Sequence, residues 1–411
     1  MRQLYDFQKE TERDLLGDKR IAVVMTGGGK TAIAMRWLHD KCLITGLKKV
    51  LIITTATKSR SGDMEQEADM WNGEGWRESL DAFEVISWHK LSNWTLDNYA
   101  HISEYVIVAD EIQKIKGYTT GMGKTFRRIA KMNPNWTGYT ATPGDKWIDL
   151  MPYFVITNKV RNKTDFTRQF CNIERYRGFP EIKSYKDEEV VQRLWRSIVT
   201  IPDTTVIENE LPSETHKTEI FKAPAGYSRV MKTSKTLDGD MLTTTMGLCH
   251  YLRQICFTKE KQQWLADFIE NLGTNCVFFC NYKEEEDKVC ELAKRALPKG
   301  AKIWRIDGKH HQIPTPDTIG KYDIVVAHYA SGGEALNLQF MHYWVAVSPN
   351  YSYSTSVQAR GRIKRIGQKH LMFFYYLKAE GTIEDDIYAC LREKREFSER
   401  TWARAKGLEY K

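Results

Sequence analysis

Short runs of β-branched and other apolar residues recur along the chain, and stretches whose apolar residues follow a helical period separate them. Runs such as VLIITT and DIVVAH are apolar on both faces, which is typical of central strands in a parallel sheet. The runs form two series, at residues 21–24, 50–54, 83–87, 105–109 and 136–139, and at residues 276–280, 302–306, 323–327, 344–347 and 372–377. Strands that alternate with helices in this way predict an α/β fold with two parallel-sheet lobes in tandem.

The segment between the two series, at about residues 146–256, has no regular alternation of strands and helices. It predicts mostly helical insertions, with the connection between the lobes near residues 202–212. We expect an N-terminal lobe over residues 1–205, with a helical insertion at about 146–200, and a C-terminal lobe over residues 206–411, with a helical insertion at about 213–258. The sequence shows no sign of a wedge or hairpin.

Composition changes this picture only slightly. The chain has 411 residues, which is enough for two domains with a core each, and its formal net charge of +8 suits a polyanionic partner without requiring one. The charged N-terminus MRQLYDFQKE is unlike a signal peptide, and no stretch approaches the roughly 20 apolar residues of a membrane span. We expect a monomer without membrane association, located in the cytoplasm, or in the host cytoplasm if a phage encodes it.

The segment RIAVVMTGGGKTAIAMRWL has a strand, a glycine-rich loop and a helix in the order of a P-loop. Because the glycines carry no side chains, successive backbone N–H groups can point at phosphate oxygens. Lys30 supplies a positive charge for the β- and γ-phosphates, and Thr31 supplies a hydroxyl for Mg²⁺. A glycine-rich turn that only caps a helix is the alternative. The segment predicts an ATP site made by Thr26, Gly27, Gly28, Gly29, Lys30 and Thr31.

Two details test this assignment. Val24 stands where the usual P-loop pattern has Gly or Ala, but the flanking strand and helix fit the motif. A second string, TTGMGKT at residues 119–125, also ends in GKT, but KIKGYT precedes it and is not an apolar strand. We therefore assign Lys124 to a basic loop and not to a nucleotide site.

The segment YVIVADEIQKIK places Asp110 and Glu111 at the end of a buried strand. This arrangement is typical of a Walker B motif, in which Asp110 holds Mg²⁺ through water and Glu111 polarises the attacking water. Because ligands gather at the carboxyl ends of parallel strands, this pair and the glycine loop are expected at the same edge of the sheet. Two acidic residues after a strand can also cap a helix, but the P-loop upstream favours the catalytic interpretation.

In the second series, SVQARGRIKRIGQ places Arg362 and Arg365 three residues apart on one helical face, with Gln358 one turn before Arg362. Two such arginines can act as arginine fingers on a γ-phosphate, or they can be solvated surface charges. Their spacing alone leaves both interpretations open.

The sequence resembles superfamily two helicases, and specifically the Swi/Snf-type branch of DNA translocases, in a compact form like that of phage motors. The resemblance covers nearly the whole chain and rests on motifs that occur in the family's order. These are LYDFQ, TGGGKT, VLIITTATKSR, EVISWHKL, DEIQ, YTATP, LRQIC, VFFCNYKEEEDKV, SGGEALNL and QARGRIKRIGQ, followed by GTIEDDIYACLREK. The resemblance implies two RecA-like lobes with helical insertions between them, ATP and Mg²⁺ as cofactors, and DNA as the partner.

The resemblance also implies roles for individual residues. Gln8 would read adenine, and Lys30 and Thr31 would hold phosphate and metal. Asp110 and Glu111 would perform the hydrolysis chemistry. Gln113, Thr140 and Thr142 would couple the nucleotide state to the lobes, and Gly333, with Ser331 and Asn337, would sense ATP and the DNA backbone. The ATP site would be completed from the second lobe by Gln358, Arg362 and Arg365.

The chain departs from the family pattern at a few positions. Motif II ends in Gln113 where the family usually has His, which we expect to alter coupling more than chemistry. Glu334 and Ala335 interrupt the usual pattern of motif V. The sequence also has no obvious accessory domain, so we expect a bare motor with protein partners for targeting as a possibility.

Two stretches rich in basic residues could contact a nucleic-acid backbone. One contains Lys114, Lys116, Lys124, Arg127, Arg128 and Lys131, and the other contains Lys159, Arg161, Lys163, Arg168, Arg175 and Arg177. Such stretches can neutralise several phosphates, although an ordinary solvated face has the same composition. Nearby aromatic residues such as Trp136 and Trp147, and Trp88 with His89, are more typical of a core than of base stacking.

The expected function is an ATP-dependent motor that moves along duplex or branched DNA, with DNA-stimulated ATP hydrolysis at a cleft between the lobes. One alternative is a strand-separating DNA helicase that acts on forks or recombination intermediates. An RNA helicase is disfavoured because motif II is not DEAD and motif VI ends in RIGQ. An ATP-gated, non-hydrolysing DNA-binding subunit is disfavoured because it has no chemical need for Asp110, Glu111 and Arg365.

Overall fold

The computed structural model describes residues 3–176, 179–310, 312–332, 336–395 and 397–407. The chain forms two compact units, Met1–Glu208 and Asn209–Lys411. Their boundary lies three residues beyond the position expected from the sequence (208 against 205). No helix among the described residues is long and apolar enough to cross a membrane.

The first lobe contains a six-stranded parallel sheet in the order β3-β2-β4-β5-β1-β8. Five of its strands were predicted from the apolar runs; the sixth, β8, was missed because it has only two residues. The strands are β1 (Ile21–Val23), β2 (Lys49–Thr54), β3 (Ala82–Ser87), β4 (Tyr105–Asp110), β5 (Trp136–Thr140) and β8 (Val199–Thr200).

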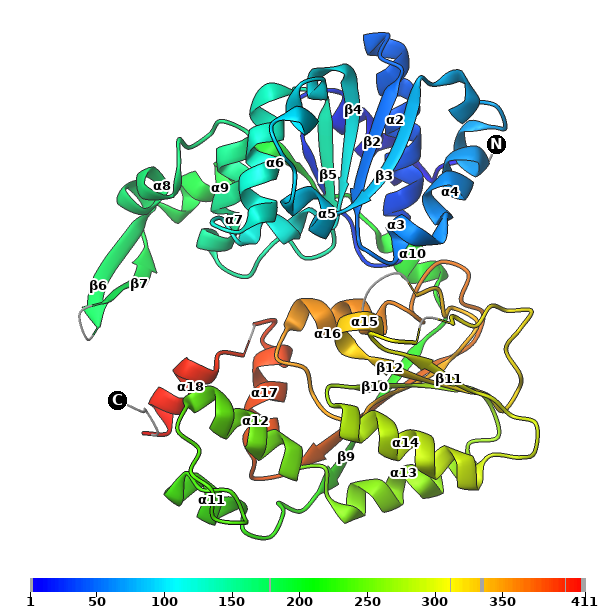
Figure 1. Cartoon of the computed structure of the whole chain (residues 1–411), viewed down its shortest axis with the longest axis vertical. Coiled ribbons are helices and arrows are strands. Elements are labelled where there is room, and N and C mark those ends of the chain that lie inside the picture. Colours follow the sequence, from blue (N-terminus) through cyan, green and yellow to red (C-terminus); the bar gives the residue numbers. More distant parts are fainter. Residues whose placement is uncertain (1–2, 177–178, 311, 333–335, 396, 408–411) are drawn as a thin grey trace. The chain divides into compact units, whose positions relative to one another are not determined.

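Both faces of this sheet are buried under helices (Figure 1). Along β4, Val106 and Val108 belong to one apolar cluster, while Ile107 and Ala109 belong to the other. This alternation explains why the strand is apolar at every position. One face packs against α1 (Asp6–Leu16), α2 (Lys30–Thr45) and α4 (Asp63–Asn72), and the other against α5 (Trp88–Ser92), α6 (Gly121–Met132), α7 (Trp147–Ile156) and α9 (Glu188–Ile198).

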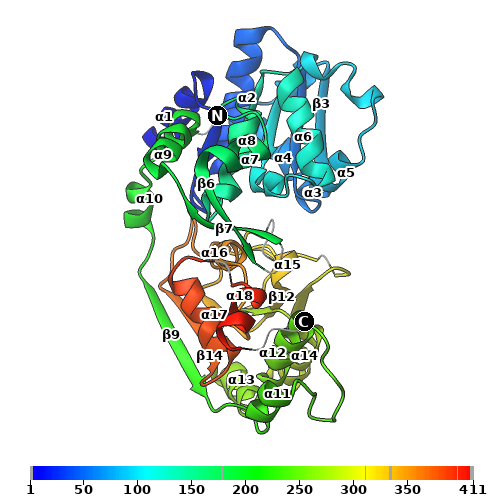
Figure 2. The same ribbon diagram turned by 90° about the vertical axis from the view of Figure 1, so that its left-hand side faces the viewer.

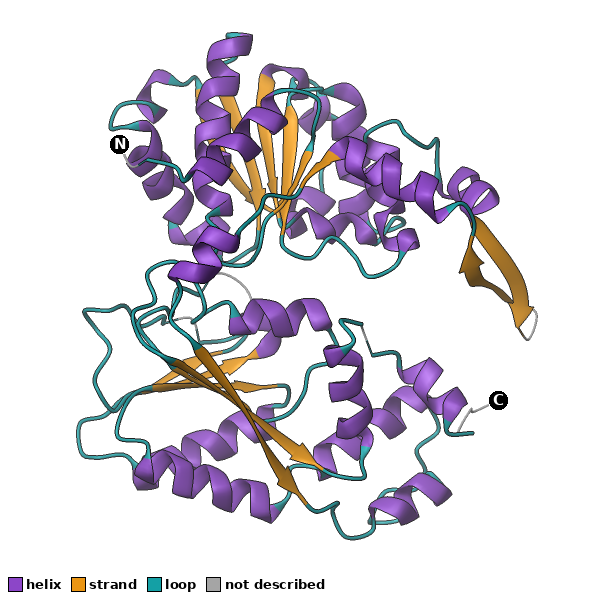
Figure 3. Ribbon diagram, turned by 180° about the vertical axis from the view of Figure 1, so that it is seen from behind, coloured by secondary structure: helices purple, strands orange, loops and turns teal. Residues whose placement is uncertain are grey.

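The insertion expected to be helical at about 146–200 is only partly so. After α7 and α8 (Lys163–Phe170), the chain forms an antiparallel hairpin of β6 (Cys171–Tyr176) and β7 (Phe179–Tyr185), before α9. Figure 3 shows this hairpin extending away from the helices of its lobe. The strands were missed because they pair only with each other and are rich in polar residues, so they lack the apolar run of a core strand.

The second lobe contains another six-stranded parallel sheet, in the order β11-β12-β10-β13-β14-β9. The five predicted strands are present as β10 (Cys276–Cys280), β11 (Ile303–Ile306), β12 (Ile324–His328), β13 (Tyr343–Ala346) and β14 (Met372–Ala379). The sixth is β9 (Glu214–Phe221), which pairs with β14 at the edge of the sheet (Figure 2). The expected helical insertion at 213–258 therefore begins with a strand, whose exposed polar residues hid it from an apolar pattern.

The other long regular elements in the described part of this lobe are helices. The helices are α11 (Tyr227–Thr233), α12 (Thr245–Ile255), α13 (Lys259–Asn271), α14 (Lys283–Ala296), α15 (Tyr329–Gly332), α16 (Tyr353–Arg360), α17 (Ile383–Arg392) and α18 (Glu399–Ala405). In the segment that joins the two sheets lies α10 (Thr205–Glu210).

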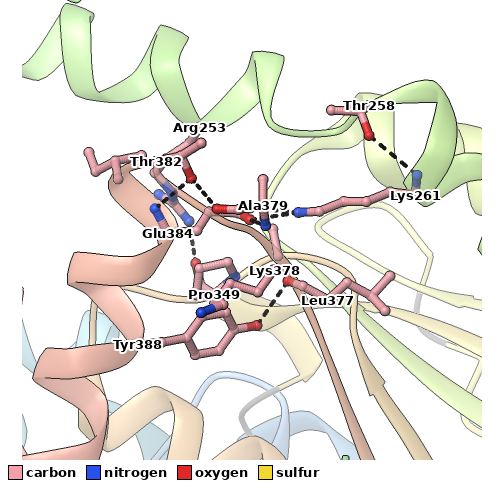
Figure 4. Close-up of polar contacts among 12 residues, drawn as sticks. Arg253, Thr258, Lys261, Pro349, Leu377, Lys378, Ala379, Thr382, Glu384 and Tyr388 are labelled. Atoms are coloured by element: carbon pink, nitrogen blue, oxygen red, sulfur yellow. Dashed lines mark hydrogen bonds and ion pairs between the residues drawn. The ribbon is translucent and has the colours of Figure 1, made fainter. Parts of the chain in front are cut away.

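A buried ion pair joins α13 to α17 (Figure 4). The Lys261 ammonium lies 2.8 and 2.7 Å from the two carboxylate oxygens of Glu384, and the side chains are 0% and 1% exposed. Glu384 also accepts a hydrogen bond of 2.6 Å from the backbone N–H of Ala379, at the end of β14. Glu384 belongs to the GTIEDD segment, so this signature anchors the last helices of the lobe to its sheet.

Replacing Lys261 with Met leaves the Glu384 carboxylate buried without its cation, so we expect a loss of about 3 kcal/mol of local stability. The measurement is hydrogen–deuterium exchange of the amides in α13 and α17, which reports their free energy of opening. The double variant Lys261→Met/Glu384→Leu should recover most of the loss, and Lys259→Met, on the same helix but exposed, should have little effect. Equal losses in the single and double variants would contradict the role of the buried charge.

Candidate functional site

The glycine loop joins the end of β1 to the start of α2. Gly27 and Gly29 have φ angles of 83° and 78°, in the left-handed region that favours glycine, and Gly29 is the residue before the helix. At Gly28, a side chain would place its Cβ 2.8 Å from a methyl carbon of Val24. The three glycines therefore make a turn that residues with side chains could not make without strain or overlap.

Gln8 holds this loop from the neighbouring helix α1. Its side chain is 2% exposed, and its amide nitrogen donates a 3.1 Å hydrogen bond to the carbonyl of Gly28. Its amide oxygen accepts a 2.9 Å bond from the backbone N–H of Tyr5. A Cβ on Gly29 would overlap the Gln8 amide. The residue expected to read adenine thus contacts the phosphate loop directly in this structure.

The Lys30 ammonium lies beside the end of β1, 3.3 Å from the carbonyl oxygen of Val24 and 3.4 Å from that of Met25. Thr31 follows it in the first turn of α2. The Thr26 hydroxyl oxygen is buried and has no hydrogen-bond partner within the described part of the chain. A buried polar atom without a partner is costly unless a ligand or water satisfies it, so the loop is suited to a polar ligand.

Asp110 is the last residue of β4 and is 6% exposed. One of its carboxylate oxygens accepts a 2.8 Å hydrogen bond from the Thr54 hydroxyl and lies 2.9 Å from the Lys58 ammonium. Burial alone would raise the pKa of Asp110, but the charge and hydrogen bond of Lys58, the bond from Thr54 and the charge of Lys30 together lower the pKa below its usual value. Because β1, β5 and β4 are neighbouring parallel strands, Asp110 and the glycine loop lie at the same edge of the sheet.

Glu111 and Gln113 follow Asp110 in a sharp turn. Glu111 has a φ of 53°, an uncommon conformation for a residue with a side chain, and a short 3₁₀ helix (Ile112–Lys116) begins after it. The Gln113 amide nitrogen donates a hydrogen bond to the Glu111 carboxylate. The Gln113 amide oxygen is buried and lacks a partner among the residues that the structure describes. Gln113 stands where the resemblance would place a His, and it contacts the carboxylate of Glu111, the candidate catalytic residue.

The end of β5 lies between those of β1 and β4 in the sheet. Thr140 is buried there, its carbonyl accepts a 2.9 Å hydrogen bond from Val24 N–H, and its hydroxyl accepts a 3.0 Å bond from Thr142 N–H. The YTATP segment is therefore bonded to the strand that leads into the glycine loop.

The second GKT string forms no P-loop. It enters α6, whose first residue is Gly121, and a 3₁₀ helix instead of a strand precedes it. The exclusion of a nucleotide site is supported, but Lys124 lies in a helix and not in the basic loop that we expected.

In the second lobe, Arg362 and Arg365 lie in turns that follow α16, and not on one helical face. They still converge, because a guanidinium nitrogen of Arg362 lies 3.4 Å, and one of Arg365 3.0 Å, from the carbonyl oxygen of Leu336. Arg365 also donates to the side-chain oxygen of Asn337. Arg362 is 7% exposed, so it is not a solvated surface charge.

Two glutamines flank these arginines. Gln358 is buried in α16. Gln368, the last residue of RIGQ, donates to the carbonyls of Met341 at 2.8 Å and Ile363 at 3.2 Å, and its oxygen accepts from two backbone N–H groups. The RIGQ signature therefore braces the turn that carries the arginines. Gly333 and the neighbouring Glu334 and Ala335 lie outside the described residues, and the side chain of Ser331 is not described.

Parts of the two basic stretches meet in the first lobe at a cavity of about 490 Å³. Its lining includes four cationic side chains and one carboxylate, from Arg127, Lys131, Lys159, Arg161 and Asp165. The Arg127 guanidinium lies 3.8 Å from the centre of the Tyr118 ring, which also lines the cavity. With four positive charges against one negative charge, the cavity favours an anionic ligand.

Sequence reasoning missed three residues that contact Asp110. Thr54 and Lys58 hold its side chain, and the indole N–H of the buried Trp88 donates a 2.7 Å bond to its backbone carbonyl. Trp88 was expected to be structural, and it is, but it fixes the strand end that carries the candidate metal ligand. The sequence does contain a signal for this contact, because Trp88 directly follows β3, which ends at Ser87.

Comparison with known proteins found relatives among ATP-dependent helicases. The chain is 24% identical over 323 residues to an uncharacterised ATP-dependent helicase of Mycoplasma genitalium, a match that covers 72% of this chain and 30% of that protein. Over 139 residues it is 24% identical to the SWI/SNF-related matrix-associated actin-dependent regulator of chromatin subfamily A-like protein 1 of Xenopus laevis, which covers 32% of this chain and 14% of the relative. The chain thus spans less than a third of the length of these relatives.

A shorter match of 119 residues, at 28% identity, is to the mouse DNA repair and recombination protein RAD54B, and it covers 27% of this chain and 13% of that protein. Among solved structures, the Sulfolobus solfataricus SWI2/SNF2 ATPase core in complex with dsDNA aligns at a TM-score of 0.43 and 16% identity, over 95% of this chain and 91% of that one. No family model matches the sequence. The chain is therefore similar to parts of ATP-dependent helicases and of a SWI/SNF-related protein, in agreement with the resemblance that its ordered motifs show.

Proposed function

We propose that the chain is an ATP-dependent DNA translocase, which couples ATP hydrolysis to movement along duplex or branched DNA. The observation that carries the proposal is the position of the glycine loop with Lys30 and of Asp110 at the same edge of the first sheet, where β1 and β4 end. The relatives support the same class, since their names describe helicases and a DNA repair and recombination protein.

The residues at this edge suit ATP with Mg²⁺. The backbone of Gly27, Gly28 and Gly29 and the ammonium of Lys30 would hold the phosphates, and Thr31 with the ionised Asp110 would hold the metal. When bound, Mg²⁺ neutralises charge on the phosphates during hydrolysis. Glu111, which accepts a hydrogen bond from Gln113, would orient the attacking water and accept its proton.

Arg362 and Arg365 are proposed to act on the nucleotide as arginine fingers, with Gln358 beside them. Their guanidinium groups converge on one carbonyl at the start of the segment around Asn337, so they form a paired cationic group. Positive charge held in place stabilises the negative charge that develops on the transferred phosphoryl oxygens. Alternating grip of the two lobes on DNA would convert each hydrolysis cycle into a step.

The DNA contact is proposed to include the basic cavity of the first lobe. Its cations suit backbone phosphates, which carry no sequence information, so binding should show low sequence specificity.

One observation favours strand separation as a second candidate function. The hairpin of β6 and β7 extends from the first lobe, and such an element can act as a wedge between strands. Displacement of a third strand from a blunt triplex reports translocation alone, whereas unwinding of a forked duplex reports strand separation. Comparing the two rates decides between the candidates.

Lys30→Ala should abolish ATP hydrolysis, because the phosphates lose their main point charge while the glycine turn remains. Steady-state phosphate release with saturating duplex DNA measures the effect. Lys124→Ala is the matched control, because it removes the lysine of the other GKT string. This variant should bind a fluorescent ATP analogue as tightly as the wild type does. Undiminished turnover in Lys30→Ala would show that the site is elsewhere.

Arg365→Ala should lower kcat at least a hundredfold, within the range for loss of a charge that stabilises a transition state, and leave the Kd for ATP nearly unchanged. Single-turnover hydrolysis and equilibrium binding of a fluorescent analogue separate the two quantities. Lys369→Ala, nearby and exposed, is the control. A weaker Kd with an unchanged kcat would contradict the finger role.

The double variant Lys131→Ala/Lys159→Ala should weaken binding to random-sequence duplex. The slope of log K against log salt should fall by about 1.8, because each phosphate that a lysine neutralises contributes about 0.9. Fluorescence anisotropy at several salt concentrations gives the slope. Lys48→Ala removes an exposed lysine outside the cavity and should leave the slope unchanged. Equal slopes for all three proteins would exclude the cavity from the DNA contact.

A further inference from the structure

Lys58 contacts one oxygen of the carboxylate that is proposed to bind the metal. It is the first residue of the short helix α3 (Lys58–Ser61), which follows β2. Its ammonium lies 2.9 Å from the Asp110 oxygen that also accepts the Thr54 hydroxyl at 2.8 Å. A carboxylate oxygen has two lone pairs, so these two donors saturate it. A divalent cation or its water that uses this oxygen has to displace one of them.

The two donors differ in how strongly they compete with a cation. The Thr54 hydroxyl is neutral and buried at the end of β2, whereas Lys58 carries a full charge and its side chain is 20% exposed. Asp110 is buried at the strand end, where a nearby positive charge interacts more strongly than in water. Lys58 is therefore the cation in direct contact with the Asp110 carboxylate, in a place where a metal ion could bind.

We propose that Lys58 is a positioning residue that acts as an internal counter-ion for Asp110 and that the divalent cation of the bound nucleotide must displace. This inference rests on the proposed function, because it takes Asp110 as the metal ligand. It assigns a role to Lys58 that the site chemistry described above does not require.

The displaced ammonium reaches solvent easily. No residue of α3 is buried, and the neighbouring Arg60 is exposed. Once Lys58 leaves Asp110, its ammonium is free to contact another anion, and a phosphate is the anion that this protein is proposed to bind. That phosphate can belong to the nucleotide or to a nucleic-acid backbone. In either case, Lys58 would move from the Asp110 carboxylate to a phosphate when the metal binds.

Removal of the ammonium should make metal binding easier. In Lys58→Met the side chain keeps its length, Thr54 still holds Asp110, and the metal no longer competes with a charge. Addition of Mg²⁺ lowers the Kd of fluorescent mant-ADP, and we expect this decrease to be about tenfold larger in Lys58→Met than in the wild type. This difference corresponds to about 1.4 kcal/mol. The Mg²⁺ concentration that gives half of the effect should also be lower in the variant.

The experiment titrates mant-ADP at a series of free Mg²⁺ concentrations, and with EDTA, against the full-length wild type, Lys58→Met, Lys58→Gln, Thr54→Val and Arg60→Ala. Binding of Mn²⁺ in place of Mg²⁺, followed by electron paramagnetic resonance, gives a readout that needs no hydrolysis. Thr54→Val removes the other donor without removing a charge, and Arg60→Ala removes a neighbouring charge that does not contact Asp110. Circular dichroism melting confirms that each variant is folded.

Stronger metal dependence in both Lys58 variants, but not in Thr54→Val or Arg60→Ala, supports the proposal. A weaker or unchanged metal dependence in the Lys58 variants overturns it, and so does an equal gain in Thr54→Val, which would indicate a loosened carboxylate and not a charge effect. A wild type that binds no mant-ADP at all contradicts the proposed function itself, so the two failures are distinguishable.

A second arm repeats the titration with saturating duplex DNA. If backbone phosphates take up the ammonium, DNA lowers the Mg²⁺ requirement of the wild type and leaves that of Lys58→Met unchanged. If the phosphates of the nucleotide take it up, DNA changes neither protein. A DNA effect of equal size in both proteins contradicts the proposal, because Lys58→Met has no ammonium to release.

Discussion

The geometry of the first lobe depends on one constraint, the parallel pairing of its strands. Parallel strands must all end at the same edge, so the ends of β1, β2, β4 and β5 lie together although they are far apart in sequence. This edge collects the glycine loop from β1, Thr54 from β2, Asp110 from β4 and Thr140 from β5. The same pairing requires helices on both faces, which buries the strands and leaves their ends as the place where polar groups can face a ligand.

Burial at this edge makes charge balance decisive. A carboxylate that is 6% exposed would be protonated more readily if it stood alone, and only cations and donors keep the pKa of Asp110 low. Lys58 and Thr54 meet this need in the structure, and Lys30 contributes from the adjacent loop. If Asp110 is the proposed metal ligand, a cation from the protein or from the ligand would balance it both before and after metal binding. The proposed exchange at Lys58 follows from this requirement.

The sequence predicted the elements that are buried on both faces and missed those that are not. All ten apolar runs are strands of the two sheets, because a central strand has little choice of residues. The edge strand β9 and the hairpin of β6 and β7 escaped, since an exposed strand needs no apolar run. Asp110 was predicted from its place after a strand, but Lys58 was not, because its contact spans 52 positions and depends on the pairing of β2 with β4. The sequence likewise could not show whether Arg362 is solvated or buried, because its guanidinium contacts the carbonyl of Leu336, which is 26 positions away.

In the second lobe, side-chain hydrogen bonds hold the RIGQ segment in place. The turn after α16 has no regular secondary structure to hold two arginines in place, so Gln368 bonds it to the carbonyls of Met341 and Ile363. The arginines in turn bond the carbonyl of Leu336, so the segment around Asn337 and the arginine turn are fixed to each other. A force on either segment is transmitted to the other through these bonds. If the chain is the proposed motor, the coupling between nucleotide state and grip on DNA would need rigid contacts more than a particular helix, and the bonds of the RIGQ turn are contacts of this kind.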